Sequence, residues 1–283
     1  MGMKARANVA TFFKYFVLIF MGFIMVYPLL WMVGSTFKTN AEIFTSLSPF
    51  TAHPTLDGYY NAVTKTYGGD ITIWRAFLNT YSYVIPKVVF TVISSVIAAY
   101  GFSRFKFKGR DFLFGVMIMT LFLPQVVLNV PQYMMYNKFN WINNPLYPAL
   151  WVPSLFATET YFVYQLVQFM RSIPHDLDEA AAIDGIKNRW QELWYVTLPA
   201  MKPQLMFGAV MSITSAFGVC DVPMALAGFP STDYAAHTVV THLFDYGFTR
   251  FEMGYASAIA TLLFLVMILC NKLIQSALRR IGT

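Results

Sequence analysis

Residues 178–203 read DEAAAIDGIKNRWQELWYVTLPAMKP, a polar segment that lies between two long apolar runs. One glycine and two prolines divide it into short pieces. Most of the surrounding chain is apolar, because 57% of its 283 residues are hydrophobic and only 12% are charged. Soluble domains carry about 25% charged residues. The composition therefore indicates a membrane protein that keeps one ordered polar segment.

The apolar residues fall into six runs of roughly 20 residues, the length at which a helix crosses a ~30 Å hydrocarbon layer. The runs are continuous, whereas the strands of membrane barrels alternate apolar and polar residues. We therefore predict an all-α membrane protein with six transmembrane helices and one domain, residues 1–283. The runs cover residues 15–34, 83–102, 112–130, 149–170, 204–227 and 254–271.

The first run follows basic residues, as a signal peptide does, but it is too long and lacks a small-x-small cleavage site before Ser35. We expect it to remain as the first span. The two cysteines, Cys220 and Cys270, lie in apolar runs and do not have the spacing of metal ligands. We expect both to be packing residues.

The basic residues predict the orientation. With the N-terminus in the cytoplasm, fourteen of the 20 Lys and Arg lie inside, five lie outside, and Lys87 falls within a span. Cytoplasmic loops carry an excess of Lys and Arg, so both termini are predicted to be cytoplasmic. The net charge of +6 then reflects topology and anionic lipid headgroups. No motif indicates nucleic acid binding.

Local signals predict that the polar segment forms a helix, a bend and a second helix. Asp178 and Glu179 place negative charge near the positive N-terminal end of the first helix. Gly185 supplies a left-handed stop. Asn188 and Gln191 have the spacing of a capping box for the second helix, which Leu198-Pro199 ends.

Three small alanines in the first helix would let another backbone approach closely, and the neighbouring acid could pair with a basic partner. Such a segment would couple the membrane domain to a rigid cytoplasmic body. The alternative is an amphipathic helix on the membrane surface. Helices of that kind are usually rich in Lys and Arg, whereas this first half carries only acids.

The order Glu179-Ala180-Ala181, Gly185, Leu198-Pro199 resembles the EAA loop of ABC importer permeases, EAA-x3-G-x9-I-x-LP. Three further stretches resemble the carbohydrate-uptake branch, in particular the maltose G-type permeases. They are PTLDGYYNAV (54–63), FLNTYSYV (77–84) and AAYGFSRFKFKGR (98–110). One departure is that the spacing from Gly185 to Leu198 is one residue longer than the pattern. We expect the added residue near the bend at Ile186-Lys187.

The resemblance implies a type I ABC importer permease fold, in which residues 172–203 sit in a cleft of a cytoplasmic ATPase subunit. Glu179 would face a basic residue there. The chain has no G-x-x-x-x-G-K-[ST] motif, so it is not an enzyme, and ATP and Mg would be bound by the partner ATPase. The residues implied in the coupling are Glu179, Ala180, Ala181, Asp184, Gly185, Leu198 and Pro199.

The same resemblance implies an assembly in the bacterial inner membrane. It would combine a second permease subunit, two ATPase subunits, an extracellular or periplasmic solute-binding protein and a sugar. The last outside loop, residues 229–251, would reach the binding protein. Its candidate contact residues are Asp233, Tyr234, His237 and His242.

Ionisable residues inside a span are candidates for function. Glu159 lies near the middle of the fourth run beside Tyr161, where its carboxylate should face a partner or a watery path. Hydrogen bonding between helices is the alternative, and it stays open for each candidate. Lys87 either reaches the interface or lines a cavity. The candidate path residues are Gln125, Asn129, Glu159, Tyr161 and Asp221.

No catalytic constellation is present, and the four histidines are scattered over loops without metal-ligand spacing. The predicted function is the permease subunit of a binding-protein-dependent, ATP-driven importer of a sugar, in particular an oligosaccharide, that works by alternating access. The alternative is a stand-alone secondary transporter or channel. That class needs ion-coupling charges and usually internal repeats, and no repeat is visible. A membrane enzyme has weaker support still.

Overall fold

The computed structural model describes residues 3–64, 71–142, 144, 146–174, 176–177, 183, 185–229, 231, 234 and 236–279. For residues 3–10, 125–126 and 278–279 it describes the backbone alone. The regular elements over these ranges are helical, which confirms the predicted all-α class. The chain divides into two compact units, residues 1–73 with 243–264 and residues 74–242 with 265–283. Each is described by itself.

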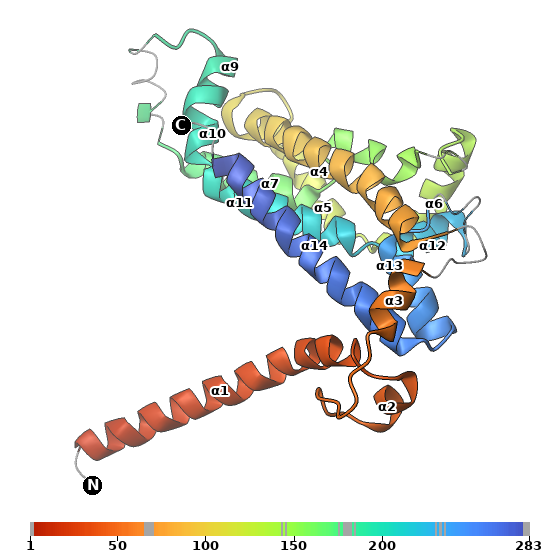
Figure 1. Ribbon diagram of the computed structural model, residues 1–283. Coiled ribbons are helices and arrows are strands. Elements are labelled where there is room, and N and C mark those ends of the chain that lie inside the picture. The colour runs from red at the N-terminus through yellow and green to blue at the C-terminus, as the bar shows by residue number, and fades with distance from the viewer. Residues whose placement is uncertain are drawn as a thin grey trace. The chain divides into compact units, whose positions relative to one another are not determined.

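The first unit begins with the long helix α1, drawn red in Figure 1. Close packing joins its shorter pieces, because Asn40 Oδ1 accepts a hydrogen bond of 2.9 Å from the Gly254 amide. A Cβ atom on Gly58 would lie 2.7 Å from the Gly254 carbonyl oxygen, so this position requires glycine. The elements are α1 (Met3–Ser35), α2 (Asn40–Thr45), α3 (Asp57–Thr64), the π-helical turn η5 (Asp245–Thr249) and the first part of α14 (Met253–Arg279).

The second unit holds the remaining helices. Helix α7 contacts both α5 and α11 (Figure 1), and its apolar face forms the main core with Leu166, Val167 and Met170 fully buried. The elements are α4 (Ile73–Arg104), α5 (Arg110–Thr120), α6 (Gln125–Lys138), the 3-10 helices η1 (Pro148–Leu150) and η2 (Val152–Phe156), α7 (Thr160–Ser172), α9 (Arg189–Glu192), the π-helical turn η3 (Leu193–Thr197), α10 (Leu198–Ala200), α11 (Lys202–Phe217), α12 (Asp221–Ala227) and α13 (Val239–Phe244), which runs into the first unit.

Over the described residues, three helices are long and apolar enough to cross a membrane: Thr11–Ser35 within α1, Ile73–Arg104, and Met253–Ala277 within α14. A fourth span results if Lys202–Phe217 and Asp221–Ala227, which meet at a 48° bend, are counted together. These four match the first, second, fifth and sixth apolar runs. Six spans stay a prediction.

The third and fourth predicted spans are interrupted helices. The run 112–130 breaks before Pro124, whose extended backbone (ψ 129°) precedes α6. The run 149–170 begins as two 3-10 helices, and Ala157 at φ 52° separates them from α7. Pro148 and Pro153 lack an amide donor, which favours short helical pieces there over a continuous α-helix. Neither run therefore forms one continuous helix.

Candidate functional site

The second half of the polar segment forms the predicted capped helix. Gly185 has φ +94°, which confirms the left-handed stop. Asn188 Oδ1 accepts a 2.8 Å hydrogen bond from the Gln191 amide, and Gln191 Oε1 accepts one of 3.0 Å from the Lys187 amide. The second bond comes from one residue before the usual donor of a capping box. Glu179, Ala180, Ala181 and Asp184 lie outside the described residues.

A π-helical turn, η3, follows α9 directly. A π-turn bonds i to i+5 and is found mostly as a single turn inside a helix, so it holds one residue more than an α-turn. The Leu198 amide bonds to the Leu193 carbonyl in this manner. The place of the segment's added residue, expected near Ile186-Lys187, stays a prediction. The helical path also continues through Leu198 and Pro199 to Ala200 and does not end at Leu198-Pro199.

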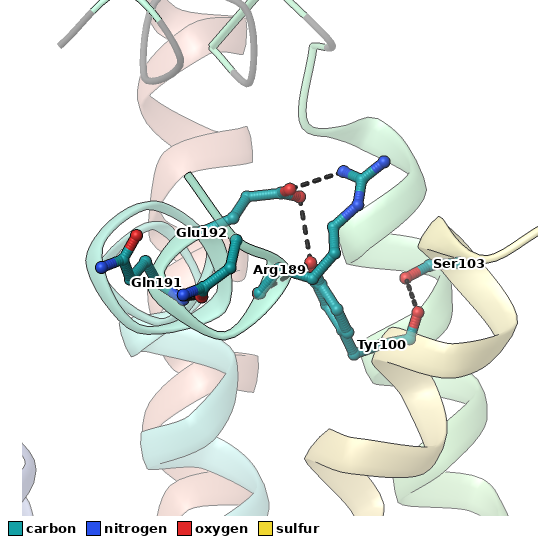
Figure 2. A network of polar contacts seen from close by, with 6 residues as sticks. Tyr100, Ser103, Arg189, Gln191 and Glu192 are labelled. Atoms are coloured by element: carbon teal, nitrogen blue, oxygen red, sulfur yellow. Dashed lines mark hydrogen bonds and ion pairs between the residues drawn. The ribbon is translucent and has the colours of Figure 1, made fainter. Parts of the chain in front are cut away.

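A buried carboxylate ties α9 to α4, and Figure 2 shows the contacts. Glu192 is 5% exposed. Its Oε2 lies 2.5 Å from Arg189 Nη1, and its Oε1 lies 3.1 Å from the Tyr100 hydroxyl. The same hydroxyl lies 3.2 Å from the Arg189 carbonyl oxygen. Sequence reasoning missed this network, because only the Arg189–Glu192 step of three residues was visible along the chain.

Glu159 stands immediately before α7 and forms an ion pair with Lys87 of α4, with 3.7 Å between Oε1 and Nζ. The carboxylate side chain is 43% exposed and the lysine side chain 19%. Two cavities adjoin this pair. Glu159 lines both of them, and Lys87 lines the larger. Of the two alternatives for Lys87, the structure therefore favours a cavity residue.

We call the smaller space the α7–α11 cavity. It has a volume of about 190 Å³. Its polar lining residues come from α4, α7 and α11, and from Glu159 just before α7: Thr91, Glu159, Tyr161, Gln165, Ser212 and Ser215. Gly208 brings α11 close to α7 here, since a Cβ atom at this position would lie 1.8 Å from the Phe162 ring. The cavity therefore depends on glycine at position 208.

The larger space, the Lys87 cavity, has a volume of about 290 Å³. Polar groups from α4, α6 and the 3-10 region meet there: Tyr83, Lys87, Gln132, Tyr136, Ser154 and Thr158. Among the predicted path residues, Glu159 and Tyr161 both line the α7–α11 cavity. Asn129 and Asp221 are not among the described residues that line either cavity. The side chain of Gln125 lies outside the described part of the chain.

Two histidines that were expected in a loop form a buried pair, and His242 lies on the short helix α13. His237 and His242 are 1% and 0% exposed, and His237 Nε2 lies 3.0 Å from His242 Nδ1. Phe229 stacks on the His237 ring, and Tyr234 meets it edge-on. Direct contact between these imidazoles and a partner does not fit this burial. Their pairing orders the loop from within.

The loop is also fastened to α4. Asn79 Nδ2 donates hydrogen bonds of 2.9 Å and 3.2 Å to the carbonyl oxygens of Tyr234 and His237. Asp233 lies outside the described residues. No group of three or more His, Cys, Asp and Glu in the described part of the chain is arranged to hold a metal ion.

Comparison with known proteins gives a family match over most of the chain. Residues 91–280 match the family model described as the inner membrane component of binding-protein-dependent transport systems. The diacetylchitobiose uptake system permease protein NgcG of Streptomyces coelicolor is 30% identical over 209 residues, which are 74% of this chain and 67% of the relative.

Two further relatives are similar over a larger part of their length. The galactooligosaccharides transport system permease protein GanQ of Bacillus subtilis is 31% identical over 218 residues, 76% of this chain and 74% of the relative. The trehalose/maltose transport system permease protein MalG of Thermococcus litoralis is 31% identical over 246 residues, 86% of this chain and 83% of the relative.

The fold is similar to that of a bacterial ABC transporter involved in the import of the acidic polysaccharide alginate. The TM-score is 0.75 at 17% identity, with 98% of both chains covered. A second structure, of a bacterial alginate ABC transporter in complex with an alginate pentasaccharide-bound periplasmic protein, gives a TM-score of 0.74 at 17% identity. It covers 99% of this chain and 98% of that chain. These likenesses establish the fold.

Proposed function

Because this chain belongs to the family of inner membrane components of binding-protein-dependent transport systems, we propose that it carries a sugar, in particular an oligosaccharide, across the bacterial inner membrane. The observation that carries the proposal is the 31% identity to the trehalose/maltose permease over 86% of this chain. The names of the other two relatives also specify saccharides.

The proposed assembly pairs this chain with a second permease subunit, two ATPase subunits and a solute-binding protein outside the cell. The chain crosses the membrane six times with both termini in the cytoplasm. Fourteen Lys and Arg on the inside against five outside support this orientation. ATP and Mg are bound by the ATPase partners, since the sequence lacks a phosphate-binding loop.

Residues 172–203 couple the membrane helices to the ATPase. Glu179, Ala180, Ala181 and Asp184 form the contact with the ATPase cleft, and Gly185 turns the chain from that contact into α9. The capped helix α9 and the hydrogen bond from Tyr100 of α4 to its Glu192 support this role. A segment that transmits movement to the membrane helices has to be held firmly against them. Leu198 and Pro199 lie in α10, which connects this segment to α11.

The substrate path passes Glu159 and Tyr161, which line one cavity. Gln125, Asn129 and Asp221 are further candidates on the same route in the full assembly. Residues 229–251 meet the binding protein through Asp233, Tyr234 and their neighbours, while His237 and His242 hold the loop in shape. Closure of the ATPase subunits then pushes the coupling segment and opens the path outward by alternating access.

The test is the ATPase activity of the reconstituted complex with Glu179→Arg. The variant is expected to assemble poorly or to lose stimulation by the sugar-loaded binding protein. Its matched control is Asp111→Arg, a charge reversal at an exposed acid of another predicted cytoplasmic link. Unchanged stimulation with Glu179→Arg would remove the coupling role of Glu179. If no ATPase copurifies with the wild-type chain, the importer proposal itself is wrong.

A further inference from the structure

The Lys87–Glu159 ion pair differs from the two ion pairs of this chain that hold a buried carboxylate. Glu192 and Asp245 meet arginines at 2.5 Å and 2.7 Å, and their side chains are 7% and 3% exposed. Lys87 Nζ and Glu159 Oε1 lie 3.7 Å apart, which is longer than a hydrogen bond, and the Glu159 side chain is 43% exposed. This pair is therefore open to a ligand, whereas the other two are closed.

Both groups of the open pair keep their capacity for hydrogen bonds. An ammonium has three donor protons, and a carboxylate has about four acceptor positions. Within the described part of the chain, neither the Lys87 ammonium nor the Glu159 carboxylate has a hydrogen bond to a protein group. Both side chains line the Lys87 cavity and are partly exposed. A ligand in this cavity can therefore bond to both.

The other accessible lining groups suit a sugar ring. The exposed Thr158 donates its hydroxyl proton to the Pro153 carbonyl at 3.3 Å, so it offers a ligand an acceptor. The half-buried Gln132 adds an amide, and the half-buried Leu150 and Val219 supply apolar surface. Small-molecule sites combine apolar walls with a few placed polar groups. Sugars present both an apolar ring face and hydroxyls that donate and accept.

Charge narrows the class of sugar. Among the described residues of the lining, Lys87 and Glu159 are the charged groups, so the lining has no net charge. An acidic sugar bonded to the Lys87 ammonium would lie at most about 7 Å from Glu159 Oε1, which is the 3.7 Å of the pair plus about 3 Å for the hydrogen bond. Salt screens charges only beyond about 8 Å. Glu159 therefore repels an acidic sugar at this site.

The size of the cavity limits how much of a saccharide it holds. Its volume of about 290 Å³ lies at the lower end of the roughly 300–1,000 Å³ of drug-sized sites. The space therefore suits one sugar unit at a time.

We propose that the Lys87 cavity binds one uncharged sugar unit of the transported saccharide. Glu159 accepts hydrogen bonds from its hydroxyls, Lys87 donates to them, and the Glu159 charge excludes acidic sugars. The proposal rests on the proposed function and deepens it, because it adds Lys87 to the substrate path and gives the pair a role in specificity.

Two measurements separate the proposed function from the proposed site. Uptake into proteoliposomes with the complete transporter and loaded binding protein tests the function. Equilibrium binding to the complete transporter in lipid nanodiscs, without binding protein, tests the site. The neutral probes are maltotriose, cellotriose and galactotriose. The anionic probe is trigalacturonate, in which a carboxylate replaces the hydroxymethyl group of each galactose unit.

Glu159→Gln removes the carboxylate charge and keeps the shape of the side chain. We expect the affinity for trigalacturonate to rise about tenfold, because two unit charges about 7 Å apart repel by at least roughly that factor at an effective dielectric constant of about 20. The affinity for the neutral sugar should fall a few-fold, because an ionised acceptor is lost. A variant that only loosened the helices would lose affinity for both probes.

Lys87→Met removes the cation and leaves the Glu159 charge alone in the lining. The affinity for the neutral sugar should fall about tenfold, and trigalacturonate should not bind. In the double variant Lys87→Met/Glu159→Gln, the gain for trigalacturonate should disappear, because the cation that binds it is absent.

Asp111→Asn is the matched control. It also removes a carboxylate that is paired with a cation, 3.0 Å from Arg110 Nε. Asp111 is not among the described residues that line the Lys87 cavity. Both affinities should equal those of the wild type.

The possible failures are distinct. If the wild type takes up none of the neutral sugars, the proposed function is wrong. If it takes up a neutral sugar but binds none in nanodiscs at millimolar concentration, only the cavity assignment is wrong. The same follows if Glu159→Gln does not raise the affinity for trigalacturonate relative to the neutral sugar. Equal affinities of the wild type for trigalacturonate and galactotriose would overturn the uncharged class.

Discussion

At the scale of single residues, Asp245 shows how a buried charge is compensated in this chain. Its side chain is 3% exposed, and its Oδ2 lies 2.7 Å from Arg250 Nε. Burial raises the pKa of Asp245 above its ordinary value, and the Arg250 guanidinium opposes that rise. The folded pKa therefore lies above the unfolded one. The ionised carboxylate costs stability above the folded pKa. This cost shrinks as the pH falls from the folded towards the unfolded pKa, and it is absent below both.

Arg250→Met should accordingly destabilise the protein in a pH-dependent manner. Loss of the guanidinium leaves a buried carboxylate without its charged partner, which costs about 1–3 kcal/mol of unfolding free energy near pH 8. The pKa of Asp245 rises further in the variant. As the pH is lowered, the carboxylate is therefore protonated at a higher pH than in the wild type, and the loss of stability becomes smaller. Thermal unfolding of the purified complex at pH 8 and pH 5 measures this, and the deficit should shrink at pH 5.

The double variant Asp245→Asn/Arg250→Met is the control for this effect, because it has no titrating group at the site. The large loss of stability that Arg250→Met shows at pH 8 should therefore be absent from the double variant. An Arg250→Met deficit of equal size at both pH values would contradict the assignment.

Single residues also show which contacts can be predicted from the sequence. Gly185 and Asn188 were predicted correctly because their partners lie within a few positions along the chain. The Lys87–Glu159 pair joins residues 72 positions apart in the numbering, and its geometry depends on how α4 packs near α7. Both charges were visible in the sequence, but their pairing was not.

At the scale of elements, α9 and η3 form a short helical segment that is held against the helices of the second unit. Leu193 of η3 joins the buried core around α7, as does Met201 just after α10. Glu192 of α9 adds a hydrogen bond from the Tyr100 hydroxyl (Figure 2). The longer spacing was visible in the sequence as one added residue. The π-helical turn η3 was not visible, because the hydrogen-bond pattern along a helix leaves no clear signature in residue types.

Tyr100→Phe should weaken coupling without preventing assembly. The change leaves one oxygen of the buried Glu192 carboxylate without the Tyr100 hydroxyl, which costs about 1–3 kcal/mol locally, so α9 moves less tightly with α4. We expect stimulation of the ATPase by loaded binding protein to fall several-fold while basal ATPase activity and copurification persist. Steady-state ATPase assays with and without binding protein measure both quantities.

Ser103→Ala is the control for the same end of α4. Ser103 Oγ donates to the Tyr100 carbonyl oxygen and to Met170 Sδ. Within the described part of the chain it has no hydrogen bond to α9. Normal stimulation is expected there. If loaded binding protein stimulates the ATPase activity of the Tyr100→Phe complex as much as that of the wild type, the Tyr100–Glu192 hydrogen bond only stabilises local packing and does not transmit movement.

At the scale of the whole molecule, hydropathy located the spans but not their interruptions. The runs 112–130 and 149–170 were read as spans from their apolar length, and the helices there break near Pro124 and between Pro153 and α7. Broken helices are tolerated at membrane depth where protein or water satisfies the freed backbone groups. Over the described residues, helix length and composition alone therefore find fewer crossing helices than six.

Whether the two interrupted runs cross the membrane determines on which side Lys138 lies. With Cys220 and Cys270 replaced by alanine, single cysteines are placed at four exposed sites, Lys108, Lys138, Ser172 and Thr249. If all six runs cross with the N-terminus inside, a membrane-impermeant maleimide labels Lys138→Cys and Thr249→Cys in intact spheroplasts. Lys108→Cys and Ser172→Cys then react only after permeabilisation.

The four positions separate the alternatives. Lys108 and Thr249 are expected on opposite sides whether the two interrupted runs cross as a pair or both turn back, so they report orientation alone. Lys138 lies between the two interrupted runs, and its protection from the outside reagent would show that residues 112–130 turn back. Since positive-inside charge already favours opposite sides for Lys108 and Lys138, we expect labelling of Lys138→Cys from outside, and with it six spans.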